Sequence, residues 1–587
     1  MELTLELPDL DNYLESDEEI AIEMLNSLFY RITYNMGKTS LVFWLDKFSD
    51  HKQGNRMILA LAESGVINTS IKHNYAEIEM SKEWLLFNHT QEELDELITA
   101  NRLNKYLPLR SDQKKPLIAN QVKLVSGIKP NGLTRPGFAK AGHHEFKYDT
   151  QMMTKYKPEI IQFSIKAMTK MEAKLHRSLR IPEGYDYGSI IEQAIDIITA
   201  ESNESYILGS LVLDSRGRAI YETLKTIFNP LSNKMARALV VTPPDIVTPD
   251  GLDNAYLCIA ELRYGFTSNI IDKIQYGQQA YRTRSYHSLD LSTEKGIDDL
   301  FENIWLERLY NDIEAYEKDN THKVTTPLEV DFSASNMTII GLLLGCNQYV
   351  NHTSYMWKVD GLSKQHVKFA QTPYVFGSTA PIKTLWTKNH LTFTPEQIDI
   401  MRYEQTKGRF AIANEFKDIL VKHSHPTAIS QFNIGEERFT VECNKSKNVG
   451  DTTKSYIVLD SKTKKFNLIN HTHTHKVPDV KQFKRYCSSG IIHNRDSRLL
   501  DNVCQKMEWI LPIHDAGIVT WSGATTMRNY AVKEMHHLYD NRKETVYNYL
   551  KSINVDQAGM VRYAKLLSRI EEVNGDSNMN ISPYLLK

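Results

Sequence analysis

One short segment near the carboxyl end of the chain constrains the fold more than any other. Residues 510–513 and 516–519 are almost entirely apolar, and they flank a polar tip made of His514 and Asp515. Two apolar runs around a short polar tip predict a strand–turn–strand hairpin that lifts one carboxylate out of a buried sheet. An aspartate at such a tip is, in other proteins, a common turn former.

A second segment has a matching design. Residues 328–331 predict a short strand that ends on Asp331, and the apolar run from Met337 to Leu344 follows. By itself, an aspartate before a helix is most often an N-cap. Asp331 and Asp515 on adjacent strands can instead hold two divalent metal ions. Such a pair serves nucleotidyl transfer, because one ion activates the attacking oxygen and the other stabilises the leaving pyrophosphate.

Composition sets loose bounds. A chain of 587 residues can bury a large core in several domains, and its net charge of −2 means that any nucleic-acid surface is a local patch. Five cysteines without CxxC spacing predict reduced thiols and a cytoplasmic setting. The acidic amino terminus does not resemble a signal peptide, and no apolar run is long enough to span a bilayer, so no membrane partner is expected.

A third segment carries lysines at helical spacing. Lys364 and Lys368 lie four residues apart, and Phe376 follows about two turns later on the same face of the predicted helix. Lysines that meet phosphates and a ring that packs by the sugar and base suit an incoming nucleoside triphosphate. An amphipathic surface helix is the alternative. Pro373 predicts a kink or an early end of this helix.

Three further segments are basic. Arg216, Gly217 and Arg218 form a tight turn in which a glycine permits close approach and each guanidinium can clamp a phosphate; a plain surface turn is the alternative. The predicted helix 158–177 carries a row of lysines that fits either phosphate contacts or a solvated face. The Gly/Pro/His-rich stretch 127–144 is interpreted as a linker or surface loop.

Five segments, in their order along the chain, resemble the motifs of the single-subunit RNA polymerases of bacteriophages and mitochondria. They are the segment with Arg216–Arg218, the DFSAS segment at 331–335, the lysine helix ending at Phe376–Gly377, IIHNRD at 491–496 and IHDAG at 513–517. The resemblance covers residues 150–587. It implies a predominantly helical α+β fold, a right hand with fingers, a thumb and a palm built on an antiparallel sheet, plus a small N-terminal domain.

The resemblance also implies a division of the chain. The expected parts are an N-terminal domain with linker (1–150), thumb helices (151–205), palm with the first aspartate (206–345), reduced fingers (346–430), a specificity-type hairpin (431–485) and palm with the second aspartate and C-terminal helices (486–587).

The implied activity is DNA-dependent RNA synthesis with two Mg²⁺ ions, from rNTPs onto the RNA 3′ end, for the transcription of phage genes in the host cytoplasm. The expected partners are template and promoter DNA, nascent RNA and rNTPs. A separate factor that opens the promoter is a further possible partner. The implied metal ligands are Asp331, Asp515 and the Phe332 carbonyl. Implied nucleotide contacts are Lys364, Lys368, Phe376 and Asn336, with Lys368 also catalytic. Implied template or hybrid contacts are Arg216, Gly217, Arg218, His493 and His514.

The chain departs from the family at several positions. Phe376 stands where the family has a tyrosine that helps to select ribonucleotides, and the short spacing from Asp331 to Lys368 implies reduced fingers, as in a compact phage subgroup. A family A DNA polymerase is the first alternative, but that family has a glutamate where this chain has Asn336, and its hairpin reads HDE. A non-catalytic DNA-binding factor is the second; the presence of Asp331, Lys368 and Asp515 together disfavours it.

A β-ribbon over about 436–470 is expected to read promoter DNA in the major groove. Alternation in 438–443 predicts one strand, 444–454 a polar loop, 456–459 a second strand, and the lysines at 462, 464 and 465 a turn before 466–469. An ordinary exposed hairpin is the alternative.

Overall fold

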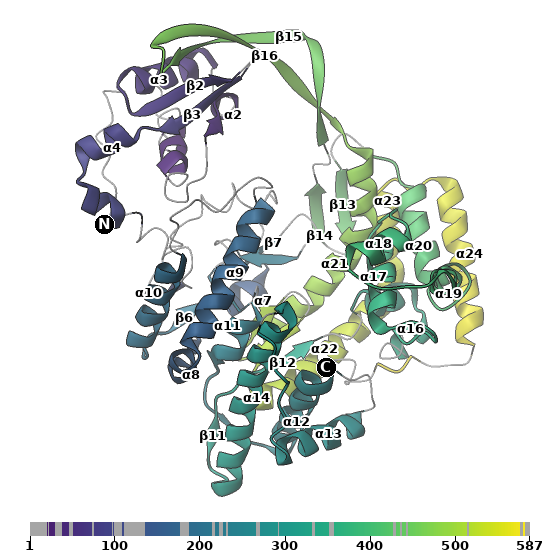
Figure 1. Ribbon diagram of the computed structural model, residues 1–587. Coiled ribbons are helices and arrows are strands. Elements are labelled where there is room, and N and C mark those ends of the chain that lie inside the picture. Colours follow the sequence, from purple (N-terminus) through teal and green to yellow (C-terminus); the bar gives the residue numbers. More distant parts are fainter. Residues whose placement is uncertain are drawn as a thin grey trace.

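The computed structural model of the chain describes residues 20–21, 23–29, 38–45, 48, 51–72, 75–96, 98, 109–110, 135–175, 187–209, 211–213, 218–221, 227–230, 233–265, 270–291, 293–331, 335–351, 357–426, 430–434, 437–441, 444–513, 516–575 and 579–581. The fold is predominantly helical with small antiparallel sheets (Figure 1). The expectation of a helical α+β protein is therefore confirmed.

The described side chains form two separate hydrophobic cores. The smaller one joins residues between Ala21 and Leu94 to residues between Tyr456 and Ile469, and the larger one runs from Phe138 to Ile581. The first core belongs to an N-terminal unit and the second to the body of the molecule. The smaller core is therefore built from two stretches that lie far apart in the sequence.

The N-terminal unit is a three-stranded sheet covered by helices. Its elements are β1 (Thr39–Ser40), α2 (Leu41–Leu45), α3 (His51–Glu63), β2 (Ile67–Lys72), β3 (Tyr75–Met80) and α4 (Lys82–Asn88), and the strand order is β1-β3-β2. Ile67, Ile78 and Met80 are buried in this sheet. The alternation of apolar and polar residues along β3 explains why one face of the sheet packs and the other is solvated.

The first half of the body includes residues that we expected to belong to a linker. Its elements are β4 (Leu109–Arg110), α7 (Pro136–Gly142), β5 (Lys147–Tyr148), α8 (Thr150–Lys155), α9 (Lys157–Leu175), α10 (Tyr187–Ala200), β6 (Tyr206–Ile207), β7 (Leu211–Leu213), β8 (Ala219–Tyr221), α11 (Lys234–Leu239), β9 (Val240–Val241), β10 (Asp245–Ile246), α12 (Pro249–Tyr264), α13 (Ile270–Arg282) and α14 (Glu294–Lys318). Residues 136–142, which we expected to be linker, are instead helix α7. Its Phe138 is fully buried, and the Phe138 amide donates to the buried Asp501 carboxylate at 2.9 Å.

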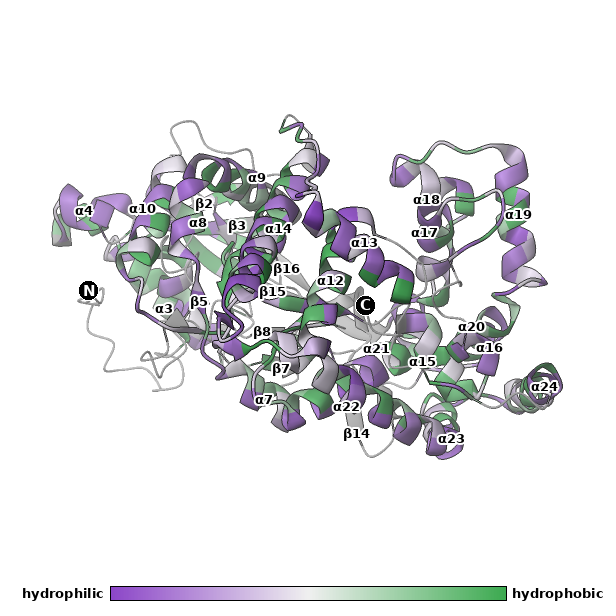
Figure 2. Ribbon diagram, turned by 90° about the horizontal axis from the view of Figure 1, so that it is seen from below, coloured by the Kyte–Doolittle hydropathy of each residue, from purple (hydrophilic) through white to green (hydrophobic). Residues whose placement is uncertain are grey.

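The second half of the body contains the elements that the motifs occupy. They are β11 (Lys323–Val324), β12 (Leu328–Asp331), α15 (Ser335–Leu344), α16 (Asn347–Asn351), α17 (Lys364–Val375), α18 (Ile382–Lys388), α19 (Pro395–Thr406), α20 (Ala411–Lys422), β13 (Ser430–Ile434), β14 (Glu437–Val441), β15 (Asn444–Asp460), β16 (Lys465–Pro478), α21 (Val480–Lys506), β17 (Leu511–Ile513), β18 (Ala516–Val519), α22 (Trp521–Asp540), α23 (Arg542–Ser552) and α24 (Gln557–Asn574). Helices α17, α18 and α19 lie together at one side of the body (Figure 2).

Local sequence signals set several helix ends around the site. Helix α12 starts after Thr248, whose side chain accepts from the Gly251 amide, and Pro249 occupies its first turn. It ends at Gly265, whose φ of 61° is the left-handed conformation that glycine adopts without strain. Thr394 and Gln397 form a complete capping box at the start of α19. These caps fix the starts of α12, which contacts β12, and of α19, which contacts α17.

A long β-hairpin links the body to the N-terminal unit. Strands β15 and β16 pair over most of their length and arch from the body to the N-terminal sheet (Figure 1). The Ser461 amide donates to the Thr69 carbonyl at 3.0 Å, and the Thr69 amide donates to Ser461 Oγ at 2.7 Å. Tyr456, Val458 and Ile469 are buried in the N-terminal core. One face of the hairpin, just before its exposed tip, is therefore part of that core.

The register of the hairpin corrects one expectation. The predicted turn at 461–464 is confirmed, but the predicted polar loop 444–454 is wrong, because these residues belong to β15. The pairing shifts between Asn448 and Thr453, which accommodates Gly450 and Asp451 within the ribbon.

Candidate functional site

Asp331 ends the edge strand of a three-stranded sheet whose order is β12-β18-β17. Leu328 and Val330 are buried, whereas Glu329 and Asp331 on the opposite face are half-buried. Asp331 pairs with Ala516, the residue that follows Asp515 in the sequence, and Ile513 pairs with Ala516 from the other side. The predicted adjacency of the two motif strands is therefore confirmed. Since α15 begins only at Ser335, Asp331 is not the N-cap of that helix.

Five of the predicted site residues lie outside the described part of the chain. They are Arg216, Gly217, Phe332, His514 and Asp515. The roles assigned to them stay predictions. Arg218 is described, and it leads into β8 of the short hairpin β7–β8, in which Leu213 pairs with Ala219. The two strands that flank the predicted turn are therefore paired, and the turn itself, at residues 214–217, lies outside the described residues.

A cavity of about 430 Å³ opens on the polar face of β12. Asp331 and Lys368 both line it, so the structure brings together the first motif aspartate and the second lysine of the motif helix. Other charged side chains in its wall are Lys234, Arg237, Glu261, Glu302, Glu329 and Arg528. A cavity with convergent charged groups of both signs is suited to bind a polyanion together with cations.

Three cations of the cavity, Lys234, Arg237 and Arg528, were not singled out by sequence reasoning. Lys234 and Arg237 lie three residues apart on α11, so they share one face of that helix. Burial is the largest single influence on the pKa of Lys234 and lowers it, but the hydrogen bond to Glu302 and the charges of Glu302, Asp298 and Glu329 together raise the pKa above its usual value, so the ammonium is charged. For Lys234 and Arg237, the Lys-x-x-Arg spacing in a short helical stretch was the available signal.

Cys258 also lines the cavity, but it is not a nucleophile. Burial raises the pKa of its thiol to about 12. A thiol with such a pKa stays protonated at neutral pH, and the thiolate is the reactive form of cysteine. The chemistry of this cavity therefore rests on carboxylates and cations.

Helix α17 positions Lys368 through a fixed start. The Ser363 side chain caps it by accepting from the His366 amide, and the Trp386 indole donates to the His366 carbonyl at 2.8 Å. Lys364 and Lys368 are both exposed at this helix. Only Lys368 lines the cavity, and Lys364 is not among the described residues that do.

The other end of α17 is seated on α21. The Ser488 hydroxyl donates to the Val375 carbonyl, and the Phe376 ring lies 4.4 Å from the His493 ring, centroid to centroid. His493 is buried in the middle of α21. Two predicted site residues more than a hundred positions apart are thus in direct contact. Helix α17 continues past Pro373 to Val375, so the early end that we predicted is only two residues from the observed one.

Gly377 makes this contact possible. Its φ is +82°, and a Cβ atom there would lie 3.3 Å from the Arg485 Cα atom. We expect Gly377→Ala to lower the free energy of unfolding by about 1–2 kcal/mol, the cost of a left-handed residue with a side chain. Thermal unfolding would measure this, with Gly265→Ala as the control, since Gly265 also has a positive φ, in the left-handed region, but has nothing within 4 Å of an added Cβ. Equal effects of the two substitutions would show that the Arg485 contact is irrelevant.

Asn336 lies on α15, five residues after Asp331. It is buried, its Oδ1 accepts from the Met337 amide at 2.9 Å, and its Nδ2 has no hydrogen-bond partner among the residues that the structure describes. Asn336 is not in the lining of the cavity as described. Its assignment as a nucleotide contact stays a prediction.

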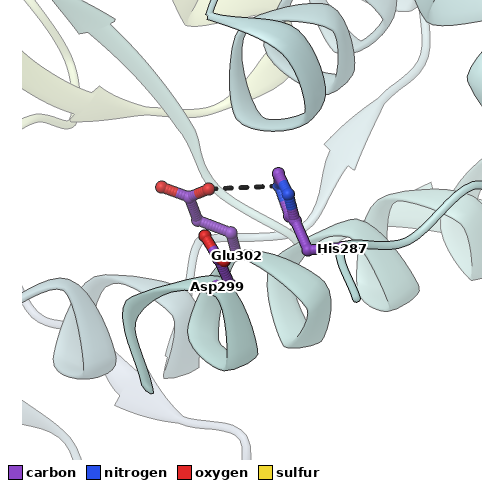
Figure 3. A group of neighbouring side chains, drawn as sticks. All are labelled: His287, Asp299 and Glu302. Atoms are coloured by element: carbon purple, nitrogen blue, oxygen red, sulfur yellow. Dashed lines mark ion pairs between the residues drawn. The ribbon is translucent and has the colours of Figure 1, made fainter. Parts of the chain in front are cut away.

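A second acidic cluster near the cavity has ordinary hydrogen-bond partners. His287, Asp299 and Glu302 lie close enough to consider a metal site (Figure 3). However, Arg263 donates to His287 Nδ1 at 3.2 Å, and His287 Nε2 lies 2.9 Å from the Leu262 carbonyl. Both ring nitrogens therefore face protein groups, and the guanidinium beside the ring disfavours a bound cation. This cluster does not fit a metal ion.

Comparison of the chain with protein-family models and with curated protein sequences gave no match. Across the ranges that are described, no helix combines the length and the apolar composition needed to cross a membrane. The assignment of function therefore rests on the site itself and on the resemblance of its motifs.

Proposed function

We propose that this protein is a DNA-dependent RNA polymerase that adds ribonucleotides to an RNA 3′ end, with the right-hand arrangement of palm, fingers and thumb. The observation that carries the proposal is the cavity shared by Asp331 on the central sheet and Lys368 on α17. In the motif resemblance these two residues belong to different motifs with complementary tasks. Their meeting in one cavity, more than thirty residues apart in sequence, supports that assignment.

In this proposal, Asp331 and Asp515 would hold two Mg²⁺ ions at the edge of the central sheet. Carboxylate oxygens are the ligands that Mg²⁺ prefers, and the pairing of Asp331 with Ala516, the residue after Asp515, supports this assignment. Bound there, the ions would supply activation of the attacking hydroxyl and stabilisation of the leaving pyrophosphate. The strand register determines where the Asp331 carboxylate stands.

The cations of the cavity would bind the triphosphate. Lys368 enters from α17 and Lys234 and Arg237 from α11, so the phosphate chain would lie between two helices. Arginine offers a planar fork that matches phosphate oxygens, and lysine acts as a point charge. In this proposal, Lys368 would also donate a proton to the departing pyrophosphate.

An extension assay tests the proposal against its alternatives. A primed DNA template, Mg²⁺ and either rNTPs or dNTPs are supplied to the full chain. Extension with rNTPs supports the proposal, and extension only with dNTPs identifies a family A DNA polymerase. Binding of DNA without extension in either mixture identifies a non-catalytic factor.

The contact between Phe376 and His493 bears on sugar selection. We expect Phe376→Tyr to raise the ratio of the rATP and dATP specificity constants. A phenol hydroxyl near the sugar rejects a deoxy substrate that leaves it unpaired. The ratio is measured by single-nucleotide extension, with Phe369→Tyr as the control because Phe369 lies on the same helix without contacting His493 in the ring pairs described. An unchanged ratio would move the discrimination to another residue, with Asn336 the next candidate.

The β15–β16 hairpin is our candidate for promoter recognition. Its inner face is buried in the N-terminal core, so DNA would meet the outer face and the tip. Ile457, Phe466 and Leu468 are exposed on the outer face, and lysines at 462, 464 and 465 are exposed at the tip. A basic tip next to exposed apolar groups suits contact with phosphates and bases.

A further inference from the structure

Both cations that α11 contributes to the cavity are already paired with carboxylates. Arg237 Nη1 lies 3.1 and 3.2 Å from the two carboxylate oxygens of Glu329, and Arg237 Nε donates to the Pro230 carbonyl at 2.8 Å. Lys234 Nζ lies 2.8 Å from Glu302 Oε1. Glu302 and Glu329 line the cavity beside their partners. The proposed phosphate-binding groups are thus engaged by the protein's own anions.

Glu302 is itself held in place. Its second oxygen, Oε2, lies 3.2 Å from His287 Nε2, so each carboxylate oxygen faces one donor (Figure 3). His287 is fixed in turn, because the Asn303 side chain bonds to both its backbone amide and its carbonyl. The cluster of Figure 3 therefore orients the carboxylate that pairs with Lys234.

Glu329 is fixed by the central sheet. It lies two residues before Asp331 on β12, so both side chains point to the same face of the strand. Its register partner is Ile518 of β18. The carboxylate that pairs with Arg237 is therefore as rigidly placed as the proposed metal ligand.

We propose that Glu302 and Glu329 are placeholders for phosphate groups. They occupy the donors of Lys234 and Arg237 until a polyphosphate displaces them, and they pair again with the two cations when pyrophosphate leaves. This inference rests on the proposed function of the cavity and assigns a role to two carboxylates that the motif resemblance does not include.

The physical consequence is competition between anions. A carboxylate and a phosphate oxygen accept the same charge-assisted hydrogen bonds from arginine and lysine. A triphosphate brings several adjoining negative groups against two separate carboxylates, whereas a lone phosphate brings one. Glu302 and Glu329 would therefore weaken the binding of every phosphate compound, and they would weaken the binding of short ones most. This difference favours binding of the triphosphate substrate and release of pyrophosphate.

The test uses inorganic tripolyphosphate and pyrophosphate as probes. Their dissociation constants are measured by titration calorimetry with the full chain, in the absence of nucleic acid and at fixed ionic strength. We expect Glu302→Gln and Glu329→Gln each to tighten tripolyphosphate binding about two- to fivefold, since a partly exposed ion pair contributes up to about 1 kcal/mol. The double substitution is expected to tighten it about tenfold. Pyrophosphate binding should tighten by a larger factor than tripolyphosphate binding.

Glu261→Gln is the matched control. Glu261 also lines the cavity, but its cation partner is Lys273, at 3.5 Å, which is not among the lining residues. This substitution removes the same charge from the cavity wall without releasing Lys234 or Arg237. Its effect on tripolyphosphate binding should be clearly smaller than that of either placeholder substitution.

Three outcomes would overturn the inference. These are equal effects of the Glu261 and placeholder substitutions, weaker tripolyphosphate binding in Glu302→Gln and Glu329→Gln, or no measurable tripolyphosphate binding by the wild type. Equal effects would indicate that the overall negative charge of the cavity wall, and not the pairing with Lys234 and Arg237, controls phosphate binding. Weaker tripolyphosphate binding would indicate that Glu302 and Glu329 only hold the two cations in place. Because the probes need no catalysis, a failed extension assay with tightened tripolyphosphate binding would refute the proposed polymerase and leave the placeholders standing.

Discussion

Asp331→Asn and Asp515→Asn are each expected to abolish nucleotide addition, with extension at least about a thousandfold slower, while DNA binding changes by less than about twofold. Each substitution removes a ligand charge from the proposed two-metal site, and the loss of about 4 kcal/mol of transition-state stabilisation corresponds to that factor. DNA binding depends instead on phosphate contacts spread over the surface. Scaffold extension and DNA binding are measured on the same preparations.

Asp399→Asn serves as the control for this prediction. Asp399 is an exposed carboxylate on α19 that pairs with Arg402 at 3.1 Å, remote in sequence from both motifs. Its extension rate should equal that of the wild type. Near-normal extension by either motif variant with Mg²⁺ would exclude that aspartate as a metal ligand.

The central sheet could be predicted from sequence because its signals are local. Alternating burial along 328–331 and an apolar run on each side of a two-residue tip need no tertiary information. The adjacency of the two motif strands was predicted from one chemical requirement, namely that two carboxylates share metal ions. The helix that carries Lys364 and Lys368 was also predicted from local spacing, and Pro373 is tolerated because α17 ends before the missing amide costs a full turn.

The cations of α11 could not be predicted in the same way. Their place in the cavity depends on how α11 packs between α14 and the central sheet, and their pairing with Glu302 and Glu329 joins residues 68 and 92 positions apart. Likewise, nothing near Phe376 indicates that His493 would lie against it. Such contacts arise from the packing of whole elements, which a pattern of single residues does not encode.

Two errors in the sequence reading share a cause. Residues 444–454 are polar and contain a glycine, which disfavours a strand, yet they extend β15 because cross-strand pairing with β16 outweighs low propensity. Residues 136–142 contain proline and two glycines, yet they form α7. A Cβ atom on Gly137 would lie 1.9 Å from the Asp501 carbonyl oxygen, so the glycine permits the close packing of α7 on α21. In both places tertiary contacts override the local signal.

The hairpin gives the second large effect that we expect. Replacing Lys462, Lys464 and Lys465 by Ala, together with Phe466→Ser, should nearly abolish initiation at the cognate promoter while elongation on a preassembled RNA–DNA scaffold survives. The promoter is obtained by selecting bound fragments of the source genome. Each lost lysine–phosphate contact lowers the slope of log Kd against log salt concentration by about 0.9. Three lost contacts therefore lower this slope by about three.

The structure determines which substitutions can test this idea. Deleting the hairpin would also remove Tyr456 and Val458 from the N-terminal core, so a loss of initiation would not separate recognition from folding. The tip lysines and Phe466 are exposed, so their replacement leaves that core intact. Lys543, Lys551 and Lys565, exposed on α23 and α24, give a control triple of equal charge. If promoter and scaffold activity fall together in the tip variant, the hairpin is structural. If neither changes, or if the control triple has the same effect, promoter reading lies elsewhere in the chain or in a partner protein.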